Sequence, residues 1–300
     1  MRVATSLQYD RLRDRMSALS TKADSLNNQL ATTKRISTPS DDAAGYRALT
    51  ALKRAGANSD AELANVDLAT SLLDSSSTAL ASIETQLGRI QAIAISAGSS
   101  TLSADQRKAL SAEVDVIFQD LVRVANTTDS RGTPLFSGDS VKTPYVIDDN
   151  GNVGFTGSGE AGQVPIGDGR TIAATSSGAT IFGSVPLKAG GTSDMFAIVK
   201  AFSDKLKTGA PVGDDSVDIQ SAMTSVLNAQ TSIGARGARL ELEKGRLEDL
   251  ALTRETERSA IEDADIPATI TELKKVMTVL DATQASFGKL TSLNLFNYLR

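Results

Sequence analysis

The stretch KRISTPSDDAAGY, residues 34–46, interrupts an otherwise helical pattern and decides how the chain is divided. A residue that precedes a proline avoids the helical region, so we expect Pro39 to end a first helix that spans residues 5–37. Ser40 is a favourable N-cap, and Asp41 and Asp42 would then lie in the first turn of a second helix, where the helix dipole favours negative charge. The two aspartates could instead form a metal site or a catalytic pair, but the structural role is the favoured interpretation.

The segment before this break carries one narrow apolar stripe. Its apolar residues alternate at spacings of three and four, which predicts a helix that buries a single face against a partner helix. They are Tyr9, Leu12, Met16, Leu19, Ala23, Leu26 and Leu30.

A second interruption, ERSAIEDADIPA at 257–268, mirrors the first. Asp265 can cap the helix that follows, and Pro267 is tolerated in a first helical turn. That last helix carries the same spacing at Ile266, Ile270, Leu273, Met277, Leu280, Gln284 and Phe287, and the chain then ends in an apolar cluster that includes Leu293 and Phe296. We expect the two terminal stripes to form a coiled coil that also serves subunit assembly.

The intervening segments predict further long helices. Apolar stripes at 63–94 and at 219–251 keep the 3–4 alternation, and Ser103 with Gln106 forms a capping box before a stripe that runs from Leu110 to Val124. A shorter helix is expected at roughly 193–207, with Met195, Val199, Phe202 and Leu206 on one face.

Residues 132–191 differ in composition, because they hold 13 of the 23 glycines and four of the seven prolines. Short strands are expected at 145–147, 153–155, 171–173 and 180–182, and Asn150-Gly151 predicts a hairpin with a type I′ turn. The alternation of Asp148, Asn150 and Asn152 also suggests a Ca²⁺ loop, but the glycine and the final glutamate of such a loop are missing. The hairpin is favoured.

Composition excludes several classes of function. The 300 residues carry a net charge of −5 without a basic block, which argues against nucleic acid as the main partner. Cysteine and histidine are both absent, so thiol nucleophiles, thiolate or imidazole metal ligands and histidine acid–base chemistry are excluded. No P-loop or nucleophile elbow occurs, and we expect neither an enzyme nor a bound cofactor. No apolar run reaches the length of a membrane span, and the first residues lack the apolar region of a Sec signal peptide, so we expect no such signal.

These patterns together predict a mainly α protein, a long-helix coiled-coil rod that the N- and C-terminal halves form together, with a small β-rich insert. The expected domains are a terminal coiled coil from 1–39 and 265–300, a helical-bundle rod from 40–138 and 193–264, and a solvent-facing insert at 139–192.

Both interruptions resemble signatures of the flagellin superfamily. ATTKRISTPSDDAAGYRAL at 31–49 is similar to its N-terminal signature, and ERSAIEDADI at 257–266 is similar to its C-terminal counterpart. Within that superfamily the chain resembles the junction proteins more than the filament subunits. Three stretches carry this likeness: ANTTDSRGTPLFSG at 125–138, a partial match in which Ser130 and Thr133-Pro134 depart from the pattern; IGARGARLELEKGRLEDL at 233–250; and the ending ASFGKLTSLNLFNYLR.

The resemblance implies a non-enzymatic subunit of the bacterial flagellum at the junction of hook and filament, exported through the flagellar type III apparatus and located outside the cell. It implies as partners further copies of itself, the other hook-associated junction protein, flagellin and an export chaperone. Two alternatives stay open at this point. One is a short flagellin that polymerises into the filament, and the other is a surface adhesin that uses the β-rich insert.

Overall fold

A computed structural model describes the backbone of residues 2–98 and 102–296 and the side chains of residues 7–98 and 102–289. Seven helices and six short strands are present in these ranges. The helices are α1 (Arg2–Thr32), α2 (Ala43–Ala97), α3 (Ala104–Ala125), α4 (Gly178–Phe182), α5 (Met195–Thr208), α6 (Asp215–Glu262) and α7 (Ile266–Phe296). The strands are β1 (Tyr145–Ile147), β2 (Val153–Phe155), β3 (Gln163–Gly167), β4 (Arg170–Ala173), β5 (Val185–Pro186) and β6 (Thr192–Ser193).

The chain is mainly α, with long helices and a small strand-containing insert, as the sequence predicts. Its contacts divide it into two compact units. The terminal unit comprises the described residues of Met1–Asn58 and Asp249–Arg300, and the body unit comprises those of Ser59–Glu248. No described helix is long and apolar enough to cross a membrane.

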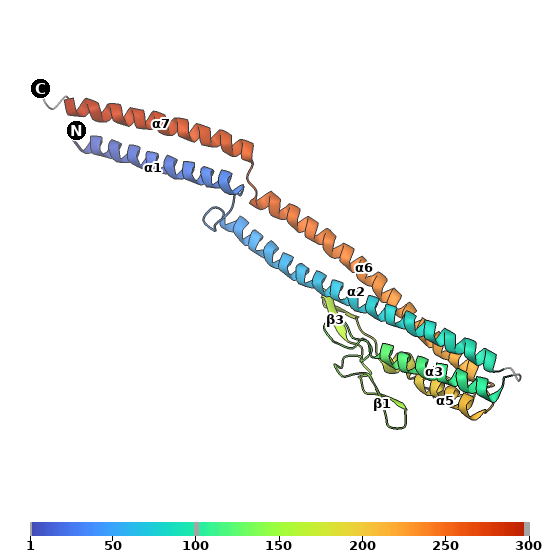
Figure 1. Ribbon diagram of the computed structural model, residues 1–300. Coiled ribbons are helices and arrows are strands. Elements are labelled where there is room, and N and C mark those ends of the chain that lie inside the picture. Colours follow the sequence, from blue (N-terminus) through green and yellow to red (C-terminus); the bar gives the residue numbers. More distant parts are fainter. Residues whose placement is uncertain (1, 99–101, 297–300) are drawn as a thin grey trace. The chain divides into compact units, whose positions relative to one another are not determined.

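In the terminal unit, α1 and α7 lie side by side and run in opposite directions (Figure 1). Ala23, Leu26 and Val276 form their buried cluster, and Leu19 and Leu273 pack against it. This cluster is small, because each helix turns only one narrow apolar face to the other. Most of the surface of α1 and α7 therefore remains uncovered in the single chain.

The body unit holds the main core. The inward face of α2 is fully buried at Leu80, Ile83, Leu87 and Ile90, in the stripe that the sequence predicts. Helix α3 begins with the expected capping box, since the Ser103 side chain accepts a hydrogen bond from the Gln106 N–H and the Gln106 side chain accepts one from the Ser103 N–H. Helix α5 packs against α3 (Figure 1).

Aromatic residues are few in this protein, and most of those described gather beneath the insert. Tyr145 lies 4.8 Å from Phe196 and 6.0 Å from Phe182, measured between ring centroids. Phe136 packs edge-on against Phe182 at 5.5 Å. Tyr145 belongs to β1, Phe182 to α4 and Phe196 to α5, so these large rings join the insert to the helices by burying apolar area.

The insert consists of three antiparallel two-stranded pairs, β1 with β2, β3 with β4, and β5 with β6. The hairpin predicted around Asn150-Gly151 is present, with Tyr145 opposite Phe155. Its turn is not the expected type I′, because only Gly151 takes a positive φ (76°) and Asp148 closes a five-residue loop by accepting the N–H groups of Asn150 and Asn152. A short aspartate side chain that pairs with its own loop favours this wider turn.

One predicted strand is wrong. Residues 180–182 belong to the short helix α4. The β-branched residues there favour a strand, but Gly178 starts a helical turn against Tyr145, and tertiary packing overrides the local preference.

Candidate assembly site at the two helix breaks

The first break begins earlier than the sequence analysis predicts. Helix α1 ends at Thr32 instead of near residue 37, and Thr33 has a positive φ of 59° that no helix can continue. Pro39 therefore lies seven positions beyond the end of the helix (39 − 32 = 7) and does not terminate it. Residues 33–36 are not helical, because they pair with residues 262–264 at the second break.

The start of the second helix also differs from expectation. Ser40 is not its N-cap, and neither aspartate lies inside its first turn, because α2 begins at Ala43. Asp42 caps it instead, since its Oδ1 accepts the N–H groups of Ala44 at 3.0 Å and Gly45 at 2.9 Å. The pKa of Asp42 is lowered by these hydrogen bonds, chiefly that from Gly45.

Asp41 closes the loop before the cap. Its Oδ2 accepts the backbone N–H of Ser37 at 2.9 Å and that of Thr38 at 2.8 Å, and these two bonds lower its pKa. Pro39 is exposed, and the Ser40 hydroxyl lies within hydrogen-bond distance of the Thr38 hydroxyl, at 2.7 Å, instead of capping α2. The two aspartates thus have structural roles, one in the loop and one in the cap.

The two breaks, far apart in the sequence, are joined by backbone hydrogen bonds. The Arg35 N–H donates to the carbonyl of Glu262 at 2.7 Å, and the Ala264 N–H donates to that of Thr33 at 3.0 Å. Lys34 and Asp263 form an antiparallel bridge between them. This pairing, which we call the break junction, satisfies backbone groups that the ends of α1 and α6 would otherwise leave unpaired.

A buried carboxylate reinforces the break junction. The side chain of Glu262 is 3 % exposed and lies 2.6 Å from Lys34 Nζ, 2.6 Å from Arg258 Nη1 and 4.0 Å from Lys53 Nζ. The hydrogen bond from Lys34 is the largest cause that holds the pKa of Glu262 below its usual value, and Arg258 and Lys53 add to it. Helix periodicity and capping rules do not single out Glu262, although the sequence carries a signal for it: a Lys-Arg pair in one break and an acidic pair in the other.

Ile36 anchors the same site from its apolar side. It is 1 % exposed, and a Cβ atom built on Gly45 would lie 2.5 Å from its Cδ1. Only glycine at position 45 leaves this space, so Ile36 can seat against the first turn of α2. In the second break, Asp265 Oδ1 accepts the Ala268 N–H at 3.0 Å, and Pro267 occupies the first turn of α7.

The stripe expected in the first helix is the face that α1 turns toward α7. Ala23 and Leu26 are buried, and the other members of the stripe are half-buried: Tyr9, Leu12, Met16, Leu19 and Leu30. Near the free ends of the helices, Tyr9 meets Phe287 edge-on, with ring centroids 5.7 Å apart. Lys22 also pairs with Glu272 across the two helices.

On α7, the packing in this chain departs from the expected stripe at every second position. Leu273, Leu280 and Phe287 are half-buried, but Ile270 and Met277 are 39 % and 50 % exposed. The buried residues one position earlier are Thr269 and Val276. Leu293 and Phe296 lie outside the residues whose side chains the structure describes.

The expected stripe through Ile270 and Met277 and the buried stripe through Thr269 and Val276 both keep the 3–4 alternation. Periodicity alone therefore could not select between the two stripes. Val276 and Met277 are both apolar, and either could face α1. Val276 does so, because it packs with Ala23 and Leu26. Ile270, Met277 and Val279 are then left as exposed apolar side chains on α7, at 39 %, 50 % and 45 %.

Comparison with known proteins identifies the family. Residues 3–140 match the bacterial flagellin N-terminal helical region, and residues 217–299 match the bacterial flagellin C-terminal helical region. The chain belongs to the flagellin superfamily. The two matched regions contain both breaks, so the break junction unites the N-terminal and C-terminal flagellin regions of one chain.

Relatives within the flagellin superfamily are similar over most of their length. The chain is 25 % identical to the flagellar hook-associated protein 3 of Escherichia coli, across 99 % of both chains. It is also 25 % identical to the flagellin of Listeria monocytogenes, across 89 % of this chain and 86 % of that protein. The crystal structure of hook-associated protein 3 from Legionella pneumophila has the same fold, with a TM-score of 0.63 at 16 % identity over 76 % of this chain and 99 % of that one.

Proposed function

We propose that the protein is a structural subunit of the bacterial flagellum, placed at the junction of hook and filament, where it adapts the hook to the flagellin filament. The observation that carries the proposal is the similarity to hook-associated protein 3, which extends over 99 % of both chains. The fold is consistent with such a role, because long helices with narrow apolar faces suit side-by-side packing of many copies.

Subunit assembly would use the terminal unit. The α1–α7 pair buries only a small cluster within one chain, and Ile270, Met277 and Val279 remain exposed along α7. Ile270 and Met277 are seven residues apart and so lie on one face of α7, which is suited to receive a helix of a neighbouring copy. The predicted assembly residues therefore divide into two groups, one that holds α1 to α7 and one, Ile270 and Met277, that would face another copy.

The predicted three domains fit this proposal. The terminal coiled coil of 1–39 and 265–300 would form the inner layer of the assembly, the helical rod of 40–138 and 193–264 the layer around it, and the insert of 139–192 the solvent-facing part. Each polymer contact would then be made by helices, and the short hairpins of the insert would be free of packing constraints.

The partners that follow from this role are further copies of the chain, the other hook-associated junction protein, flagellin and an export chaperone. The protein would act outside the cell, in the flagellum, and would not be an enzyme. Among the described residues, no three of the acidic side chains gather as they would around a metal ion, and the aspartates at the first break are engaged by backbone N–H groups.

A filament flagellin is the second candidate, and the similarity to the Listeria protein favours it. The two candidates differ in where the protein lies. Immunogold electron microscopy of intact flagella, with antibody raised against residues 139–192, tests both. We expect a single labelled collar between hook and filament. Label along the whole filament would identify a flagellin, and label elsewhere on the cell envelope would overturn both and support an adhesin.

Variants of α7 test in the same cells whether the α1–α7 pair is needed for assembly. Leu273→Asp and Leu280→Asp put a charge into the half-buried face of α7, and we expect both to abolish incorporation while the insert still folds. Thr278→Asp introduces the same charge at an exposed position and serves as the control. Normal incorporation of both leucine variants would contradict the assignment.

A further inference from the structure

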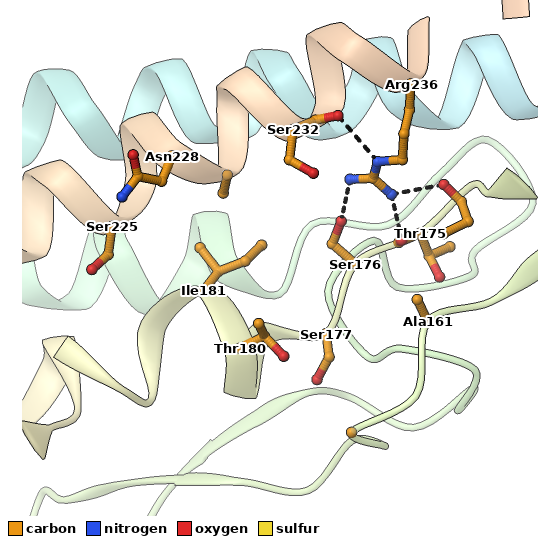
Figure 2. A pocket seen from close by; sticks show the side chains of 13 residues that line it. Ala161, Thr175, Ser176, Ser177, Thr180, Ile181, Ser225, Asn228, Ser232 and Arg236 are labelled. Carbon is orange, nitrogen blue, oxygen red and sulfur yellow. Dashed lines mark hydrogen bonds between the residues drawn. The ribbon is translucent and has the colours of Figure 1, made fainter. Parts of the chain in front are cut away.

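A cavity of about 480 Å³ lies in the body unit between α6 and the insert (Figure 2). One wall comes from α6, with Asn228, Ser232 and Arg236, and the other comes from the end of β4, the loop after it and α4. None of the residues that line it is an aspartate or a glutamate. The cavity is unrelated to the break junction, which lies in the terminal unit.

Of the described residues that line this cavity, Arg236 alone is charged, and the groups that accept its hydrogen bonds are neutral. The guanidinium donates from Nη1 to the carbonyls of Ala173 at 2.7 Å and Thr175 at 3.1 Å, from Nη2 to Ser176 Oγ at 2.8 Å, and from Nε to the carbonyl of Ser232 at 3.3 Å. Across the described residues, no carboxylate lies within ion-pair distance of it. Burial lowers the pKa of Arg236, as expected for a cation without a counter-ion.

Hydrogen-bond donors outnumber acceptors around this cation. A guanidinium has five N–H groups, and four are used, so one on Nη2 is available. Ser176 Oγ accepts from Arg236, which leaves its own proton for another acceptor. The side chains of Thr180, Asn228 and Ser232 are exposed, and in the part of the chain that the structure describes they make no hydrogen bond to another protein group.

We propose that this cavity binds a small hydroxylated carboxylate of the sugar-acid class. Its carboxylate would accept hydrogen bonds from Arg236 Nη2 and the Ser176 hydroxyl, and its hydroxyl groups would pair with Asn228 and Ser232. A carboxylate supplies the negative charge and the acceptors that the cavity lacks, and a charge-assisted pair with a half-buried arginine is stronger than one in open water. The volume admits a ligand of monosaccharide size. The proposal goes beyond the junction role and does not rest on it.

Isothermal titration of the full chain with D-glucuronate tests the proposal, with D-glucose as the matched neutral sugar. We expect glucuronate to bind at least about tenfold more tightly than glucose, because only the acid pairs with the arginine. Equal affinities, or no binding of glucuronate, would overturn it.

Variants locate the site. Asn228→Ala and Ser232→Ala each remove one side-chain hydrogen bond to the ligand and should weaken glucuronate binding about fivefold. Ser225→Ala lies in the same cavity on the same helix, but its hydroxyl already donates to the Ser221 carbonyl at 3.2 Å, so we expect no change. Arg236→Gln should abolish binding. Because loss of the guanidinium could also loosen residues 173–176, Asn228→Ala and Ser232→Ala test the site without removing the arginine. Wild-type affinity in both Asn228→Ala and Ser232→Ala would place the ligand elsewhere and overturn the proposal.

The same carboxylate chemistry could come from an acidic side chain of a second copy. Sedimentation of the full chain at high concentration, with and without glucuronate, separates the sources. A monomer under both conditions supports a free sugar acid as the ligand. Self-association that glucuronate reverses and Ser232→Ala weakens supports the same site with a neighbouring copy as the donor of the carboxylate.

Discussion

Replacement of Glu262 by glutamine tests the idea that one buried carboxylate holds the break junction. The substitution keeps the size of the side chain and one hydrogen-bond acceptor but removes the charge that faces Lys34 and Arg258, each 2.6 Å away. A hydrogen bond to a charged group contributes about 1.5–3 kcal/mol when it is shielded from water. The side chains of Lys34 and Arg258 are 42 % and 33 % exposed, so both cations regain water once the charge is gone.

We therefore expect Glu262→Gln to destabilise the break junction by about 2 kcal/mol, which is roughly a 30-fold increase in the equilibrium constant for its opening. Hydrogen exchange followed by mass spectrometry measures this directly. The Arg35 and Ala264 N–H groups are held by the junction, so peptides that cover 33–37 and 261–265 should exchange roughly 30-fold faster.

Glu255→Gln is the matched control, since Glu255 pairs with the same Arg258 but its side chain is 59 % exposed. An exposed ion pair contributes little stability, so exchange at the junction should change by no more than roughly twofold. If Glu262→Gln speeds exchange no more than Glu255→Gln does, the reasoning is refuted.

Protonation of Glu262 at low pH should destabilise the break junction as Glu262→Gln does. The pKa of Glu262 is lowered in the folded chain, so its contribution is fully present above the ordinary glutamate pKa and is lost as the pH falls through the lowered value. Exchange at the break junction should therefore show a pH-dependent opening below the ordinary range for glutamate, and the glutamine variant should lack it.

Two further predictions concern packing. Val276→Asp places a charge in the cluster that joins α7 to α1 and should cost about 3 kcal/mol, seen as loss of helical circular dichroism at lower temperature, whereas Val279→Asp, at a position 45 % exposed, should leave the melting curve unchanged. Gly178→Ala would put a Cβ atom 2.3 Å from the hydroxyl oxygen of Tyr145 and should destabilise the body unit by about 1–3 kcal/mol in urea unfolding, whereas Gly159→Ala, with no atom within 4 Å, should be neutral.

Most of the long helices could be predicted from the regular spacing of apolar residues. The stripe at 63–94, the capping box at Ser103 and the buried face of α5 at Met195, Val199, Phe202 and Leu206 lie where the sequence predicts them. These elements are long or carry a complete local signal, and the hydrophobic stripe that buries each one is visible in the sequence itself.

The errors fall where contacts between distant residues decide the outcome. Helix α1 ends at Thr32 because residues 33–36 pair with residues 262–264, which a local rule about Pro39 cannot foresee. The choice of Val276 over Met277 likewise depends on Ala23 and Leu26. Glu262 looked like one more acid on a polar helix, because its burial arises only when the two breaks meet.

The α1–α7 pair has a consequence for the order in which the chain folds. The hairpin of β1 and β2 closes over five residues, whereas Lys22 and Glu272 are 250 positions apart. Closing a longer loop costs more entropy, and the small buried cluster between the two helices contributes little stabilising free energy to offset that cost. We therefore expect the terminal pair to form last, once α7 has been synthesised, and to open first. Until then α1 lacks its partner helix, and a chain cut short before Ile266 would lack α7 altogether.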